Sequence, residues 1–98
     1  MTLSIWGVSV LLFLAGLAMV VLRRQLLAML LGLELMINSV NIALVYTGSL
    51  WADAEALSAA LLILAIAAAE VVVGLSLILK LNGAGAPVDS SGLSELKG

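Results

Sequence analysis

Residues 26–46, which read LLAMLLGLELMINSVNIALVY, give the clearest indication of the fold class. The run lies between the basic pair Arg23-Arg24 and a more polar stretch over 47–55, which is predicted to form a loop. At 1.5 Å per residue, an apolar helix of about 20 residues crosses the roughly 30 Å hydrocarbon layer of a membrane. The sequence therefore predicts a transmembrane helix that carries an acid, Glu34, in its interior.

Two further apolar runs of similar length flank this stretch, over about 3–22 and 56–79. Core helices of soluble proteins are usually shorter and carry a polar stripe. The first run does not match a cleaved signal peptide, because its positive charges follow the apolar stretch instead of preceding it. We predict an all-α integral membrane protein with three transmembrane helices, forming a single membrane domain over 1–98 with a tail over 80–98.

The composition excludes most soluble functions. Of the 98 residues, 64% are hydrophobic and 10% are charged, and the mean hydropathy is +1.32, whereas an ordinary soluble domain is about 25% charged. Cysteine and histidine are absent from the sequence, which excludes thiolate zinc sites, iron–sulfur clusters and histidine-ligated haem in this chain. The small net charge of −2 gives no reason to expect nucleic-acid binding. We expect no catalytic residue, cofactor site or metal site here, so any chemistry must use carboxylates.

The charged residues predict how the chain crosses the membrane. Three spans place all the basic residues on one side of the membrane: Arg23, Arg24, Lys80 and Lys97. Asp53 and Glu55 fall on the other side. Cytoplasmic segments carry the excess of Lys and Arg, so we expect the N-terminus outside and the C-terminus in the cytoplasm. The tail from Asn82 onward is rich in Gly and Ser, and we expect it to be disordered or laid along a partner.

Glu34 and Glu70 are the only ionisable side chains inside the apolar runs. A charged residue at the centre of a membrane helix costs about 2.5–3.5 kcal/mol on insertion scales. Arg24 precedes Glu34 by ten residues and Lys80 follows Glu70 by ten, so both acids lie near the midplane at nearly the same depth. This pattern favours proton transfer by the two carboxyl groups. The alternative is that each is a neutral acid that only forms a hydrogen bond between helices.

Polar and small residues surround the two acids. Asn38 and Asn41 follow Glu34 at i+4 and i+7, which places them on its face of the helix as a supporting polar stripe able to hold water. Their alternative role is to join helices by amide hydrogen bonds. Glu70 follows small residues, Ala67 to Ala69, which allow close helix contacts. The chain supplies no cation at this depth and too few helices to enclose a water path. We therefore expect an obligate part of a larger membrane complex.

The sequence resembles a known family in four motifs: RRQLL at 23–27, GLELMIN at 32–38, AAAE at 67–70 and GL at 74–75. They are similar to the small K subunit (chain 4L) of proton-pumping NADH–quinone oxidoreductase, respiratory complex I, and the resemblance extends to the tail over 88–98. One departure is that members commonly carry a Gly-Gln pair and aromatic residues where this chain reads ALSAA at 56–60, which puts the local packing in doubt.

The resemblance implies a translocase subunit in the membrane arm of the complex, in the bacterial inner membrane, with no independent catalytic activity. Glu34 and Glu70 would belong to the axis that couples quinone reduction to proton translocation, and Arg23 and Arg24 would be the basic residues of the cytoplasmic loop. The partners would be other membrane-arm subunits. FMN, the iron–sulfur clusters and quinone would be bound by other subunits.

Other membrane proteins of similar size offer alternative interpretations. The related subunit of multi-subunit sodium/proton antiporters generally lacks the two midplane acids, and a related subunit of membrane-bound hydrogenases would keep them. A small multidrug exporter would have four spans and an acid in the first one, where this chain has none. A holin, which forms pores, has no need of two midplane acids.

Overall fold

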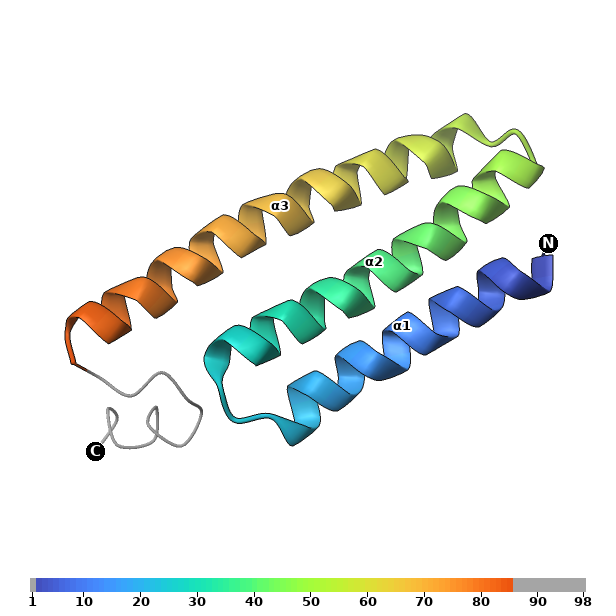
Figure 1. The fold of residues 1–98 in the computed structure, drawn as a ribbon. Coiled ribbons are helices and arrows are strands. Elements are labelled where there is room, and N and C mark those ends of the chain that lie inside the picture. Colours follow the sequence, from blue (N-terminus) through green and yellow to red (C-terminus); the bar gives the residue numbers. More distant parts are fainter. Residues whose placement is uncertain (1, 86–98) are drawn as a thin grey trace.

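The structure, a computed structural model, describes residues 2–85, which form three α-helices. Helix α1 is Thr2–Leu22, α2 is Leu26–Leu50 and α3 is Ala54–Gly83 (Figure 1). All three are long and apolar enough to cross a membrane, which confirms the predicted all-helical class and the number of candidate spans. The predicted tail is described only as far as residue 85, and its segment over 86–98 lies outside the described residues.

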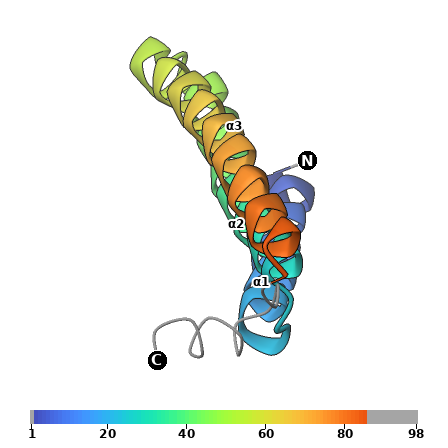
Figure 2. The same cartoon turned by 90° about the vertical axis from the view of Figure 1, so that its left-hand side faces the viewer.

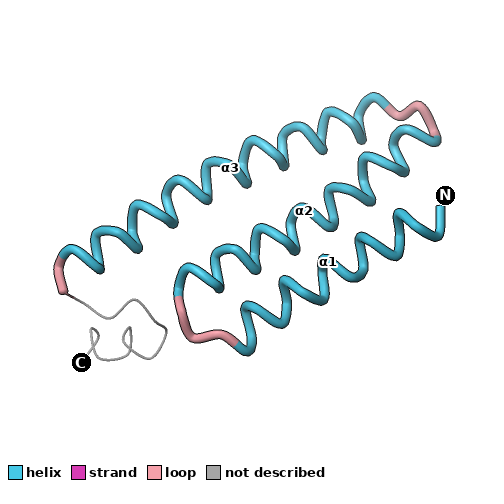
Figure 3. Tube along the Cα trace, in the orientation of Figure 1, coloured by secondary structure: helices cyan, strands magenta, loops and turns pink. Residues whose placement is uncertain are grey.

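The connection between α2 and α3 is shorter than predicted. The expected loop over 47–55 was wrong in extent, because α2 continues to Leu50 and α3 begins at Ala54. The Asp53 side chain accepts hydrogen bonds from the backbone N–H groups of Glu55 (3.0 Å) and Ala56 (3.2 Å), and such a cap begins a helix in polar sequence. Ala52, at a positive φ of 49°, turns the chain between the helices. The helices therefore extend beyond the apolar runs, and Figure 3 shows that only a short loop joins α2 to α3.

The three helices lie side by side in a row, with α2 in the middle and neighbouring helices antiparallel (Figure 1). Seen from the edge in Figure 2, the row is narrow, and the molecule measures 51 × 24 × 18 Å. The N-terminus and the α2–α3 turn lie at one end, and the α1–α2 turn and the last residues of α3 lie at the other. Helix α2 therefore separates α1 from α3 and contacts both.

Small residues bring α1 and α2 together. Gly16 and Gly32 oppose each other so closely that a Cβ added to Gly32 would lie 2.6 Å from the Gly16 carbonyl oxygen. Nearer the N-terminal end of α1, the Ser9 hydroxyl donates to the backbone carbonyl of Ser39 at 2.6 Å. Close backbone approach at glycine and serine is the usual way in which membrane helices associate. The α1–α2 pair therefore forms a tight unit.

Large apolar side chains cover the outside of all three helices. Among the described residues, the only buried hydrophobic side chains are those of Ala60 and Ala67, both on α3 where it faces α2. A soluble protein of this size would instead enclose its leucines and isoleucines. The apolar surface therefore suits lipid or the apolar surfaces of other chains.

Candidate functional site between α2 and α3

The packing of α3 against α2 sets the relative height of the two acids. A Cβ added to Gly74 would lie 2.9 Å from a terminal carbon of Leu30, and the Asn41 side chain reaches the backbone of Ala60. Glu34 follows Leu30 by four residues and Glu70 precedes Gly74 by four. Because α2 and α3 are antiparallel, this register places the two acids at the same level, as the residue count suggested.

Glu34 is one helical turn from Leu30, which packs against Gly74, so it lies on the side of α2 that faces α3. Its side chain is half-buried. Its Oε1 atom is buried, yet it forms no hydrogen bond with any group in residues 2–85. An unpaired buried polar atom costs free energy, about 1–3 kcal/mol in proteins. This carboxyl group is therefore available to a partner from outside the described chain, such as water or another subunit.

Glu70 occupies a different position from Glu34. Its side chain is exposed, whereas Ala67, three residues earlier, is buried against α2. Glu70 follows Ile63 by seven residues, which is about two turns, so the two share one flank of α3. Ile63 lines a hollow together with Ile37 and Val40 of α2. Glu70 therefore lies on the face of the helix row that carries this apolar hollow.

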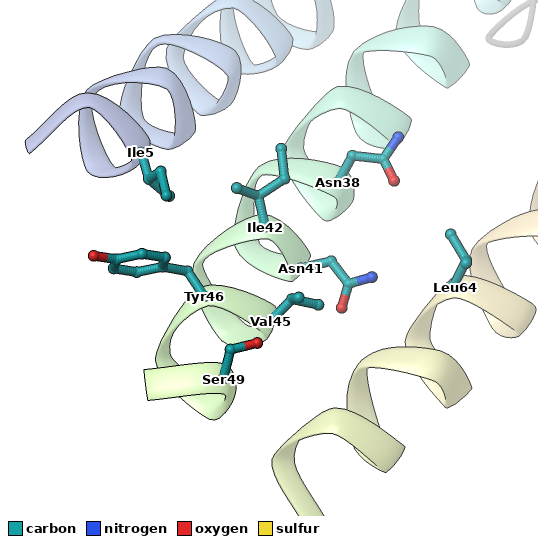
Figure 4. Close-up of a pocket in the computed structure, with 8 residues that line it drawn as sticks. All are labelled: Ile5, Asn38, Asn41, Ile42, Val45, Tyr46, Ser49 and Leu64. Carbon is teal, nitrogen blue, oxygen red and sulfur yellow. The ribbon is translucent and has the colours of Figure 1, made fainter. Parts of the chain in front are cut away.

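The opposite face carries a larger groove of about 700 Å³ (Figure 4). Its lining includes Ile5 of α1, Asn38, Asn41, Tyr46 and Ser49 of α2, and Leu64 of α3. Figure 4 shows the side chains of Asn38 and Asn41 extending from α2 toward α3. The asparagines predicted as a stripe thus share one groove, and this groove is on the other side of the row from Glu70.

Asn41 joins the helices and also retains an unused acceptor. Its Nδ2 donates to the Ala60 carbonyl oxygen at 3.2 Å, which is the interhelical amide bond considered as an alternative role. Its Oδ1 is buried and accepts no hydrogen bond from the described part of the chain. Asn38, by contrast, is exposed along the groove.

The predicted loop arginines lie far from the two acids. Arg23 and Arg24 are exposed in the α1–α2 turn, at the same end of the molecule as Lys80. The ten residues from Arg24 to Glu34 span about 15 Å of helix. No group of three acidic side chains that could hold a metal ion occurs within residues 2–85. The assignment of cofactors to other chains stays a prediction.

Sequence reasoning did not identify the outer part of the groove. Tyr46 and Ser49 line it, and the Tyr46 hydroxyl is hydrogen-bonded to Thr2 Oγ1 at 2.6 Å. Ser49 follows Asn38 by eleven residues, which is close to three turns, so helical periodicity could have added it to the stripe. Nothing in the sequence pairs Tyr46 with Thr2, because that contact depends on how α1 packs on α2.

Comparison with known proteins decides the family. The family model of NADH-ubiquinone/plastoquinone oxidoreductase chain 4L matches residues 4–98. The chain belongs to this family. It is 40% identical over 88 residues to NADH-quinone oxidoreductase subunit K of Syntrophotalea carbinolica, which covers 90% of this chain and 87% of that protein.

Membership of the chain 4L family confirms the resemblance carried by the four motifs. It favours a subunit of NADH–quinone oxidoreductase over the antiporter and hydrogenase subunits considered as alternatives. The match also includes residues 56–60, so the unusual ALSAA segment does not take the chain out of the family.

Proposed function

We propose that this chain is a membrane-arm subunit of a proton-translocating NADH–quinone oxidoreductase, in which Glu34 and Glu70 take part in proton transfer that is coupled to quinone reduction. The main support is the position of the two acids, which lie at one level on neighbouring helices. In addition, one carboxyl oxygen of Glu34 is buried and has no hydrogen-bond partner within residues 2–85. A neutral acid used only to join α2 and α3 would bond across the interface, as Asn41 does.

The rest of the proposal concerns the surroundings of the subunit. The chain contributes no redox group, and FMN, the iron–sulfur clusters and quinone are bound by other subunits. It assembles obligatorily with other membrane-arm subunits in a bacterial inner membrane, with the N-terminus outside. The exposed apolar surface of all three helices supports such assembly, and the absence of cysteine and histidine agrees with a subunit that holds no cluster or haem.

Glutamine substitutions test the proposal, because glutamine keeps the shape and hydrogen-bonding reach of glutamate but cannot release a proton. We expect Glu34→Gln to lower quinone-coupled proton pumping about a hundredfold or more, the lower end of what a lost proton-transfer group costs, and Glu70→Gln to lower it less. Glu34 is expected to matter more because it lies one helical turn from Asn38, which lines the groove, whereas Glu70 lies on the other face of the row. Pumping is measured in inverted membrane vesicles, and assembly on native gels.

Glu55→Gln is the matched control, because Glu55 is exposed in the first turn of α3, far from the two acids. It should pump and assemble normally. Full pumping by the Glu34→Gln, Glu70→Gln double variant would end the proton-transfer proposal, while leaving membership of the family unaffected.

A further inference from the structure

The groove on the asparagine face runs along the outer half of α2. Asn38 is one helical turn beyond Glu34, and Ser49 is the second-last residue of the helix, beside the α2–α3 turn. The groove thus extends from the level next to Glu34 to one end of the molecule. Along this length it offers two amides and two hydroxyl groups among apolar side chains: Asn38, Asn41, Tyr46 and Ser49.

Two buried acceptors along this line need hydrogen-bond donors. Glu34 Oε1 and Asn41 Oδ1 are both buried and unpaired within residues 2–85, and they are seven residues apart on one face of α2. Lipid acyl chains have no donors to offer. Water supplies two donors per molecule, typically binds otherwise unsatisfied buried polar groups, and occupies about 30 Å³ in the liquid. The groove of about 700 Å³ has room for a file of water molecules.

The other face of the helix row lacks such a path. Its hollow is lined by apolar side chains, including Ile37 and Val40 of α2 and Ile63 of α3. On α2, Ile37 lines the apolar hollow while its neighbour Asn38 lines the groove. On α3, Ile63 lines the hollow while its neighbour Leu64 lines the groove. Successive residues point about 100° apart around a helix. Glu70 lies on the apolar face, on the flank of Ile63.

We propose that the groove lined by Asn38, Asn41 and Ser49 is a water inlet that connects Glu34 with the end of the molecule at the α2–α3 turn, and that Glu70 lies outside it. The inference rests on the proposed function and deepens it, because it gives the two acids different surroundings. Glu34 exchanges protons with water in the inlet, whereas Glu70 faces the apolar side of the row.

Single-cysteine variants test the inlet, because the chain has no cysteine of its own. The variants are Asn38→Cys against Ile37→Cys, and Leu64→Cys against Ile63→Cys. Each pair lies at one depth and differs in the face it occupies. The assembled complex in membrane vesicles is treated with a water-soluble methanethiosulfonate, which reacts with the hydrated thiolate, and the mass shift of the subunit is followed over time.

We expect the groove-side cysteines to react about tenfold or more faster than their neighbours, because thiolate formation is suppressed in apolar surroundings. Equal rates within each pair would overturn the proposal. So would four unreactive variants, since the groove would then be filled by lipid or by a partner chain.

A second measurement uses Ser49→Cys, which changes one atom at the outer end of the groove. Attaching a bulky methanethiosulfonate there should lower pumping severalfold by blocking the inlet. Ser58→Cys, an exposed serine of α3 outside the groove, is the matched control and should pump normally after the same treatment. Unchanged pumping by blocked Ser49→Cys would contradict the inlet.

The experiments distinguish failure of the water inlet from failure of the proposed function. Labelling measures access of water and does not depend on pumping. If the cysteine pairs react equally while Glu34→Gln still stops pumping, the inlet is wrong and the proposed function stands. If the double glutamine variant pumps fully, the proposed function falls whatever the labelling shows.

Discussion

Position 34 combines two energetically unfavourable conditions, which support the proposed role of Glu34 in proton transfer. An acid in the interior of a membrane helix costs about 2.5–3.5 kcal/mol on insertion scales, and Glu34 leaves one oxygen without a hydrogen bond from the described chain. Leucine at this position would pack between α2 and α3 without either cost. Asn41 shows that the same interface can join helices with an uncharged amide, so joining helices does not require an acid.

Moving the acid along α2 tests whether water supplies it. We expect Glu34→Gln with Asn38→Glu to recover part of the lost pumping, because position 38 lines the groove and water bridges the shift of about 5.4 Å per turn. Glu34→Gln with Leu30→Glu should recover none, because Leu30 packs against Gly74. Pumping is compared between membrane preparations that contain equal amounts of the assembled complex. Equal recovery at both positions would mean that distance from position 34, and not the groove, decides whether the moved acid works.

The sequence predicted the residues of the site but not how they divide between faces. Helical spacing put Glu34, Asn38 and Asn41 on one side of α2, and counting residues put Glu70 at the depth of Glu34. The rotation of α3 about its axis decides where Glu70 points. That rotation follows from the packing of Leu30 on Gly74 and from the Asn41–Ala60 bond, and neither contact can be derived from one sequence.

The two interfaces of α2 are built differently. Toward α1, glycine backbones touch, and an added Cβ at Gly32 would also lie 2.9 Å from the Cβ of Met19. Toward α3, the nearest atoms to an added Cβ at Gly74 belong to the flexible end of Leu30. Beside Glu34, the α2–α3 interface is therefore packed through a side chain that can change rotamer, whereas the α1–α2 interface is packed through backbone.

Glycine-to-alanine substitutions should separate the two interfaces. Gly32→Ala forces backbones apart, and we expect it to destabilise α1–α2 packing by about 1–3 kcal/mol, as overpacking does. Gly74→Ala should cost less, because Leu30 can change rotamer. Gly7→Ala is the control, since nothing lies within 4 Å of its added Cβ. Each variant complex is heated to a series of temperatures, and the amount that remains intact is measured on native gels. These amounts rank the variants by stability. A loss for Gly7→Ala as large as that for Gly32→Ala would contradict this description of the interfaces.

The whole molecule has distinct ends and almost no interior. Its surface leucines and isoleucines need an apolar environment, and only Ala60 and Ala67 are buried hydrophobic side chains in residues 2–85. The number and approximate position of the helices could be predicted from apolar length alone. The last turn of α2 and the first turn of α3 could not, because capping by Asp53 and the positive φ of Ala52 set the connection between them, and hydropathy does not report either feature.

The charges at the two ends predict the direction in which the water inlet opens. Arg23, Arg24 and Lys80 lie at one end, and Asp53 and Glu55 lie at the other. By the positive-inside rule we expect the basic end to face the cytoplasm and the α2–α3 turn, with the mouth of the groove, to face outward. Alkaline phosphatase inserted at Ala52 should then be active, and green fluorescent protein fused after Gly98 should fluoresce.

A fusion inserted after Arg24 provides the internal control, since the α1–α2 turn should report the cytoplasm together with the C-terminal fusion. Replacing both turn arginines by glutamate should weaken the preference of the α1–α2 turn for the cytoplasmic side, because it removes two of the four basic residues of the chain. If the Ala52 insertion instead reports the cytoplasm, the groove opens inward. Glu34 would then exchange protons with water on the cytoplasmic side of the membrane.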